Sequence, residues 1–220
     1  MRYALPSRFF NRVLSSAWAG ALFLLWAGAC MAADPVRILA LGDSLTAGYG
    51  LPSGQGFTDQ LEARLKAEGY PVRVLNAGVS GDTSAGGRAR LDWALADRPD
   101  IAIVELGAND GLRGLEPEAM RANLDSTLRR LREAGVRVLL TGMRAPPNLG
   151  RAYEDAFNRV FPELAKKHGV AYYPFFLDGV AADASLNQPD GIHPNRKGVS
   201  VIVDRIAPFV VRLLAALKQE

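Results

Sequence analysis

From residue 36 onward, short apolar runs alternate with segments in which apolar residues recur at the spacing of a helix face. The runs are nearly unbroken, as is typical of strands buried on both faces. They are VRILAL (36–41), VRVLNA (72–77), IAIVEL (101–106), VRVLLT (136–141) and VAYYPF (170–175). Residues four and seven or eight apart share one side of a helix, and this spacing predicts helices around residues 57–65, 120–131, 153–164 and 202–217. The alternation predicts an α/β fold, with a five-stranded parallel sheet between two layers of helices.

A parallel sheet brings the carboxyl ends of its strands to one edge, and ligands of such sheets bind in the crevice beyond that edge. Four polar clusters occupy the matching positions, three directly after an apolar run and one before the last predicted helix. Taken singly, each has the composition of an ordinary turn. Together they predict a site at this edge, formed by GDSLT (42–46), AGVSGDTSAGG (77–87), GANDGLRG (107–114) and PDGIHPN (189–195).

The last of these clusters contains a candidate general base. Asp190 and His193 are three residues apart, a spacing that brings two side chains together in a helical turn or a tight loop. A carboxylate bonded to one imidazole nitrogen fixes the tautomer and makes the other nitrogen more basic. The second histidine, His168, stands at a predicted helix end, where a cation suits the helix dipole, and is expected to be structural.

Ser44 is the candidate nucleophile, because it directly follows the first apolar run and because a serine attacks carbonyl groups once a base takes its proton. One alternative is that Asp43 or Ser44 merely caps a helix. The other is that a hydroxyl of the second cluster attacks instead. These hydroxyls lie among glycines, which suits backbone positioning better, and they belong to Ser80, Thr83 and Ser84.

Acyl transfer also requires hydrogen-bond donors for the oxyanion near this serine. Gly81 lets the backbone approach a ligand closely and offers its N–H. Asn109 carries an amide donor on the predicted loop after the third apolar run. Asn-Asp-Gly is also a strong turn sequence, so an Asx turn is the alternative for Asn109.

Taken together, the clusters resemble the four sequence blocks that characterise the SGNH (GDSL) hydrolase family. The resemblance extends over nearly the whole chain after residue 33. The matching segments are GDSLTAGYG (42–50), NAGVSGDTSAGG (76–87), ELGANDGLRG (105–114) and DGIHPN (190–195). The resemblance implies a three-layer α/β/α, flavodoxin-like fold, in agreement with the periodicity. The third block of the family often has a second glycine where this chain has Ala108, which places a methyl group beside the donor.

The resemblance also implies a role for each candidate residue. Ser44 corresponds to the nucleophile, His193 to the general base and Asp190 to the group that orients the base. The oxyanion hole then consists of the backbone N–H groups of Ser44 and Gly81 and the side-chain amide of Asn109.

Within the family, the chain most resembles the secreted bacterial arylesterases and the periplasmic acyl-CoA thioesterase/lysophospholipase. This implies hydrolysis of carboxylic esters or thioesters through an acyl-serine, with neither a cofactor nor a metal. Apolar residues on or near the converging loops suit short to medium acyl chains, although each one taken alone equally fits a core or loop anchor. They are Leu112, Leu115, Pro146, Pro147, Leu149 and Ile192. Two rival functions remain, a carbohydrate O-acetylesterase acting on envelope polysaccharide and a non-catalytic secreted binding module.

Other hydrolase and ligand-binding patterns are missing from the sequence. The α/β-hydrolase elbow requires Gly-x-Ser-x-Gly, and Thr46 stands in the place of the second glycine. Neither of the glycine-rich phosphate-binding patterns occurs. The chain has one cysteine and two widely separated histidines, which give no metal-binding pattern.

The first thirty residues have the organisation of a secretory leader. Arg2, Arg8 and Arg12 precede the apolar run VLSSAWAGALFLLWAGAC (13–30), and small residues follow it. We predict a signal peptide over residues 1–32, cleaved from a single hydrolase domain over residues 33–220 that is periplasmic or secreted. The alternatives are an uncleaved membrane anchor and a lipid-modified N-terminus at Cys30.

The charge of the chain comes from this leader. The formal net charge is +3, and the leader contributes three arginines and no acid, so the remainder is close to neutral. Nucleic-acid binding requires a clustered basic face, and is therefore not expected. The expected partner is a small-molecule or lipid acyl ester or thioester, and the expected form is a monomer without a stable membrane span after cleavage.

Overall fold

The computed structural model describes Met1 and residues 34–218. The predicted signal peptide and Cys30 therefore lie outside the described residues, apart from Met1. From Asp34 onward the chain forms one compact unit.

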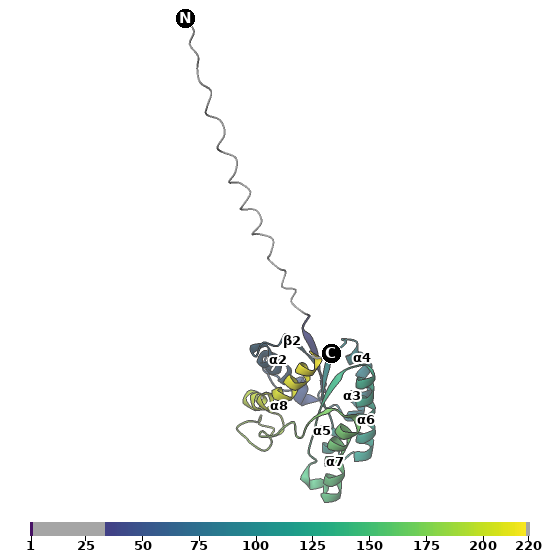
Figure 1. Cartoon of the computed structure of the whole chain (residues 1–220). Helices are drawn as coiled ribbons and strands as arrows, with labels where there is room; N and C mark the ends of the chain where they lie inside the picture. Colours follow the sequence, from purple (N-terminus) through teal and green to yellow (C-terminus); the bar gives the residue numbers. More distant parts are fainter. Residues whose placement is uncertain (2–33, 219–220) are drawn as a thin grey trace. The chain divides into compact units, whose positions relative to one another are not determined.

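The centre of this unit is a five-stranded sheet in the order β2-β1-β3-β4-β5, with every neighbouring pair of strands parallel (Figure 1). All five apolar runs form strands, so the predicted fold class is confirmed. The register places Gly42, the last residue of β1, beside Gly78 of β2 and Glu105 of β3. The strands are β1 (Val36–Gly42), β2 (Val72–Gly78), β3 (Ile101–Glu105), β4 (Arg137–Thr141) and β5 (Ala171–Tyr173).

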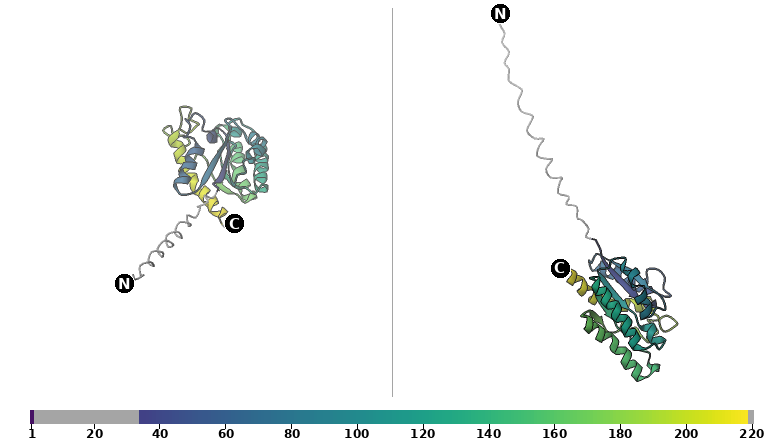
Figure 2. Two further views of the ribbon diagram at one scale, coloured as in Figure 1. Left: turned by 90° about the horizontal axis from the view of Figure 1, so that it is seen from above. Right: turned by 90° about the vertical axis from the view of Figure 1, so that its right-hand side faces the viewer.

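Helices cover both faces of the sheet, as Figures 1 and 2 show. Helices α2 (Phe57–Ala67) and α8 (Arg196–Leu217) pack together on one side. Helices α6 (Pro117–Glu133) and α7 (Arg151–His168) pack together on the other, and α3 (Ser84–Ala89) packs against α6. This is the three-layer arrangement that the alternation of strands and helices predicts.

The four long helices follow the predicted apolar stripes. In α6, for example, Met120, Leu124, Leu128 and Leu131 are completely buried. The stripe of α8 departs from the prediction at its end, because the buried side chain after Val210 belongs to Leu214, whereas the expected Leu213 and Leu217 are only partly buried. Among the described residues, no helix has the length and apolarity needed to cross a bilayer.

Hydrophobic periodicity does not predict the short helices of this fold. A helix of four to six residues is too short to display an apolar stripe. Gly87 in α3 shows what holds one of them in place, since a Cβ atom there would lie 2.3 Å from Leu106 Cδ1. Close packing therefore outweighs the low helix propensity of glycine. The segments are α1 (Ser44–Ala47), α3, α4 (Leu91–Leu95), α5 (Ala108–Leu112) and the 3₁₀ turn η1 (Pro147–Leu149).

Candidate active site

Ser44 is the first residue of α1, immediately beyond the carboxyl end of β1. Capping of this helix falls to Asp43, whose Oδ1 accepts a hydrogen bond from the Leu45 N–H at 3.0 Å. Helix capping, the alternative role considered for Ser44, is therefore the role of its neighbour Asp43. Asp43 supplies the cap, and the Ser44 hydroxyl is left to bond elsewhere.

The turn that carries Ser44 requires glycine at position 42. A Cβ atom on Gly42 would lie 2.1 Å from Thr46 Oγ1 and 2.5 Å from Glu105 Oε2, both far inside contact distance. The space beside the strand end is filled by the hydroxyl and the carboxyl group, which bond to one another at 2.8 Å. Any side chain at position 42 would displace this pair and shift the serine with it.

Ser44, His193 and Asp190 form a continuous chain of hydrogen bonds. His193 Nε2 lies 2.9 Å from Ser44 Oγ, and His193 Nδ1 lies 2.7 Å from Asp190 Oδ2. The segment before α8 thus brings the imidazole to a serine 149 residues away in sequence. With Nδ1 donating to the carboxylate, Nε2 is the free acceptor that can take a proton from the serine.

Backbone hydrogen bonds hold Asp190 in this position. Its Oδ1 accepts from the Ile192 N–H at 2.9 Å and from the His193 N–H at 3.0 Å. The bond from His193 N–H, followed by those from Ile192 and from the imidazole, lowers the pKa of Asp190 to about 2. The carboxylate therefore stays ionised at neutral pH and well below it.

The three predicted oxyanion donors lie at this same edge but are not equally free. Neither the Ser44 N–H nor the Gly81 N–H donates to another residue among those described, and Gly81 has a φ of +81°, a conformation that favours glycine. Asn109 Nδ2, by contrast, donates to Asp43 Oδ2 at 2.9 Å and to the Asp82 carbonyl at 3.0 Å. The two backbone donors therefore have no partner within the described residues, whereas the amide must share or exchange one of its bonds.

Asn109 is the second residue of α5, which corrects its predicted position on a loop. The Asx-turn alternative also fails, because the Gly111 N–H, which such a turn would direct to the Asn109 side-chain oxygen, donates to the Gly107 carbonyl instead. Two of the three competing hydroxyls of the second cluster, those of Thr83 and Ser84, are engaged in holding α3. Thr83 caps the helix at the Gly86 N–H, and Ser84 Oγ donates to Asp110 Oδ1 at 2.6 Å.

Beneath Ser44 lies a pair of buried carboxyl groups that the sequence analysis did not identify. Glu105 Oε2 accepts from the Asp43 N–H at 3.2 Å and from the Thr46 hydroxyl, so it holds the residues on both sides of the serine turn. Burial, and then the charge of Asp43, raises the pKa of Glu105 well above its ordinary value. Burial raises the pKa of Asp43 to about 6, against the hydrogen bonds from Leu45, Glu105 and Asn109. A signal was available, since Glu105 is the only charged residue in the run IAIVEL.

Arg90 is a second residue that sequence reasoning missed. Its guanidinium donates to the Gly42 carbonyl at 2.9 Å and to the Ala77 carbonyl at 2.8 Å, and its Nε donates to Asp82 Oδ2 at 2.7 Å. It therefore ties the ends of β1 and β2 to the segment whose carbonyl receives the Asn109 amide. No sequence pattern distinguished this arginine from its exposed neighbour Arg88.

His168 has the structural position expected for it. It ends α7 and its Nε2 lies 2.7 Å from Asp125 Oδ1 of α6. This places it at the opposite edge of the sheet, where β5 begins.

The predicted substrate-contacting residues lie on three segments near this edge. Leu112 and Leu115 are exposed on and just after α5, and Ile192 is exposed beside His193. Pro147 and Leu149 belong to η1, and Leu149 Cδ2 would lie 3.9 Å from a Cβ atom placed on Gly114. The contact roles of these five residues, and of Pro146 directly before η1, stay predictions.

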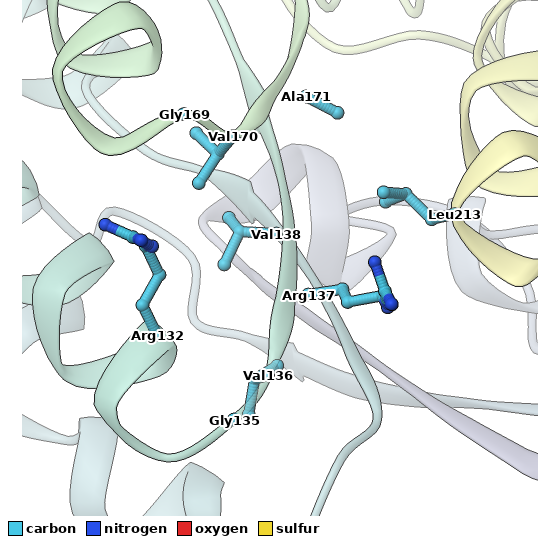
Figure 3. Close-up of a pocket in the computed structure, with 9 residues that line it drawn as sticks. All are labelled: Arg132, Gly135, Val136, Arg137, Val138, Gly169, Val170, Ala171 and Leu213. Atoms are coloured by element: carbon cyan, nitrogen blue, oxygen red, sulfur yellow. The ribbon is translucent and has the colours of Figure 1, made fainter. Parts of the chain in front are cut away.

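A cavity of about 280 Å³ opens at the other edge of the sheet (Figure 3). Its lining includes Arg132 and Arg137, but their side chains extend on different sides of β4. The pocket thus lacks the converging polar groups that mark the Ser44 edge. It is lined by the amino-terminal ends of β4 and β5 and by Leu213.

A hydroxyl bonded to an imidazole–carboxylate pair, with open backbone donors beside it at the carboxyl edge of a parallel sheet, defines the class of serine hydrolases. Residues 40–201 match the model of the GDSL-like lipase/acylhydrolase family. The chain belongs to this family, as its sequence blocks predict.

Relatives match over most of the domain. The chain is 44% identical to esterase TesA of Pseudomonas aeruginosa over 80% of its own length and 89% of the relative. It is 40% identical to thioesterase 1/protease 1/lysophospholipase L1 of Escherichia coli K12 over 80% of its own length and 84% of the relative. A crystal structure of TesA superposes with a TM-score of 0.77 at 43% identity, covering 80% of this chain and 99% of that one. The chain is therefore an SGNH hydrolase of the esterase and thioesterase type.

Proposed function

We propose that the protein cleaves carboxylic esters and thioesters through an acyl intermediate on Ser44. In the first step Ser44 Oγ attacks the carbonyl carbon while His193 Nε2 takes the hydroxyl proton. The imidazolium then gives this proton to the leaving oxygen or sulfur, and the acyl group stays on the serine. Water then attacks the carbonyl carbon of the acyl-serine while His193 again acts as base. The proton returns to Ser44 Oγ, and the carboxylic acid is released.

The observation that carries this proposal is the unbroken path from Ser44 Oγ to His193 at 2.9 Å and on to Asp190 at 2.7 Å. Both distances lie within the range needed for proton transfer and for holding the imidazole in one tautomer. The ionised Asp190 stabilises the imidazolium that forms during the attack.

In this proposal, the oxyanion receives hydrogen bonds from the Ser44 and Gly81 N–H groups and from Asn109. The two backbone donors make no other hydrogen bond within the described residues, so they can bond the oxyanion without breaking one. Asn109 contributes by exchanging one of its present bonds, to Asp43 or to the Asp82 carbonyl, for the oxyanion.

Apolar esters and thioesters are the substrate class supported by the surroundings, because five large apolar side chains are exposed on the segments that carry the candidate catalytic groups. Relatives named esterase and thioesterase cover four-fifths of the chain, so neither the O-acetylesterase nor the binding-module alternative is favoured. A monomeric state stays part of the proposal.

The leading experiment is labelling with a fluorophosphonate, which reacts with an activated serine. We expect stoichiometric labelling on Ser44, and Ser44→Ala should lose both the label and at least about 10³-fold in ester hydrolysis. Ser80→Ala, which removes one of the competing hydroxyls of the second cluster, should still be labelled. Equal labelling of Ser44→Ala and the unaltered protein would contradict the proposal.

Export is a separate part of the proposal and rests on the residue pattern of the leader alone. The expected product is a periplasmic or secreted chain that begins near residue 33. Mass spectrometry of the protein purified from fractionated cells measures this directly. A cell-envelope product that retains residues 1–32, or that carries a lipid on Cys30, would contradict cleavage by an ordinary signal peptidase.

A further inference from the structure

The exposed apolar side chains of this protein are concentrated around one site. Within residues 34–218, six large hydrophobic side chains are exposed, and five of them lie on the segments that carry the candidate catalytic groups. The sixth, Trp93, lies on α4. Exposed apolar groups gathered beside polar ones mark a ligand site. The five are Tyr49, Val79, Leu112, Leu115 and Ile192.

These five side chains fall into two sets, according to whether they lie on the side of the substrate's leaving group or on the side of its acyl chain. The leaving atom of the substrate must take a proton from His193 Nε2, so the leaving group lies against the imidazole. The acyl chain extends from the other side of the same carbonyl. Val79 and Leu112 lie on the segments of the oxyanion donors Gly81 and Asn109, whereas Tyr49 and Ile192 flank the imidazole.

Tyr49 is the one exposed aromatic side chain of this set, and it packs directly on the imidazole. The two ring centroids are 4.6 Å apart with an angle of 39° between the planes, and Tyr49 is 53% exposed. One side of the tyrosine ring therefore contacts His193, and much of the ring is open to a ligand. Ile192, exposed and next in sequence to His193, adds an aliphatic group on this side.

Backbone hydrogen bonds fix the tyrosine relative to the catalytic groups. The Tyr49 N–H donates to the Ser44 carbonyl at 3.1 Å, and Gln188 Nε2 donates to the Tyr49 carbonyl at 2.7 Å. The Gln188 N–H in turn donates to the His193 carbonyl at 2.7 Å. The serine, tyrosine and histidine segments are thus tied together, which makes the ring a preorganised surface.

We propose that Tyr49 and Ile192 form the subsite for the leaving group, and that this subsite selects flat, aromatic leaving groups. The inference rests on the proposed function, because it takes His193 as the donor of the leaving-group proton. An aryl ring bonded to the departing oxygen packs on the open part of the Tyr49 ring, and an alkyl group of the same acidity gains less from this contact. Leu112, Leu115 and Val79 contact the acyl chain instead.

The test compares two butyrate esters whose leaving groups are closely matched in acidity, chlorophenyl butyrate and hexafluoroisopropyl butyrate. The measured quantity is the ratio of kcat/KM for the aryl ester to that for the alkyl ester. Tyr49→Leu should lower this ratio about 5- to 10-fold, and Tyr49→Phe should keep it. Trp93→Leu removes an exposed aromatic ring elsewhere and should change neither the ratio nor the activity.

Leu115→Ser provides the control on the acyl side. It should alter the dependence of kcat/KM on acyl-chain length without moving the aryl-to-alkyl ratio. If Tyr49→Leu lowers both kcat/KM values equally, the tyrosine only positions His193, and the subsite is overturned. An unchanged ratio overturns it as well. Unaltered protein that hydrolyses neither ester and is not labelled at Ser44 overturns the proposed function, and the subsite with it.

Discussion

At the scale of single residues, the unusual feature is a carboxyl group without access to water next to another carboxyl group. Glu105 is fully buried, and its Oε1 has no hydrogen-bond partner within the described part of the chain. Two buried negative charges side by side are strongly unfavourable, so the pair retains a proton. We assign this proton to Glu105, because both oxygens of Asp43 accept a hydrogen bond, from Leu45 and from Asn109, whereas Glu105 Oε1 accepts none within the described residues.

This retained proton makes the stability of the protein depend on pH. A glutamate with a raised native pKa contributes fully below its unfolded value, near 4.5, and its contribution is lost as the pH rises toward the native value. Glu105→Gln replaces the carboxyl group by an amide, which does not titrate. The free energy of unfolding of the variant minus that of the unaltered protein should therefore increase as the pH rises from about 4.5 to about 8, by at most about 1.4 kcal/mol per pH unit.

Urea denaturation at a series of pH values measures this difference. Glu118→Gln is the matched control, since Glu118 is an exposed glutamate on α6, and its difference should stay flat. A difference for Glu105→Gln that is flat, or that decreases as the pH rises, would show that Glu105 is ionised in the native state.

At the scale of elements, the site depends on how the ends of β1 and β2 are held against the segment leading into α3. Arg90, the residue after α3, provides three hydrogen bonds that join them. Both Arg90 and Asp82 are largely buried, so this ion pair is shielded from water. One guanidinium thus links the strand end before Ser44 to the carbonyl that receives the Asn109 amide.

Replacing Arg90 by methionine should therefore affect catalysis and stability together. We expect Arg90→Met to lower kcat about 10-fold or more, because the oxyanion donors lose their common support, and to lower the free energy of unfolding by about 1–3 kcal/mol. For Arg90→Lys, kcat and the free energy of unfolding should lie between those of the unaltered protein and those of Arg90→Met. An ammonium group pairs with Asp82 but lacks the planar guanidinium that bonds both carbonyls. Steady-state kinetics and urea denaturation measure the two effects.

Arg88→Met is the control, because Arg88 lies on the same helix and is exposed. It should leave kcat and stability near their original values. An Arg90→Met protein with an unchanged kcat would show that the strand ends and the donor segment keep their arrangement without the guanidinium.

At the scale of the whole molecule, the site exists because parallel strands end at a common edge. Ser44 follows β1, Gly81 follows β2 and Asn109 follows β3, while His193 precedes α8. Their convergence could be predicted from the sequence, because the alternation of strands and helices indicates a parallel sheet, and the strands of a parallel sheet all end at one edge. Residue chemistry suggested the roles of the individual residues and the family resemblance supported them, whereas periodicity alone would have given neither.

Hydrophobic periodicity does not predict contacts between side chains on different strands. The Glu105 carboxyl meets Thr46 because the register of β1 and β3 pairs Gly42 with Glu105. A shift of two residues in that register would leave the pattern of apolar runs unchanged but would separate this pair. The short helix that carries Asn109 was likewise invisible, since its stability comes from packing and not from its own sequence.

The sequence by itself determined the five strands, the long helices, the edge at which the polar clusters meet and the family to which the chain belongs. These follow from local periodicity and from residue types at fixed spacings. Only the tertiary structure decided that Asp43 caps the helix that begins at Ser44, that Glu105 and Arg90 support the turn, and that Tyr49 packs on His193. Each of these contacts depends on strand register and on close packing between segments far apart in the chain. The sequence around a residue does not indicate which distant residue it will contact.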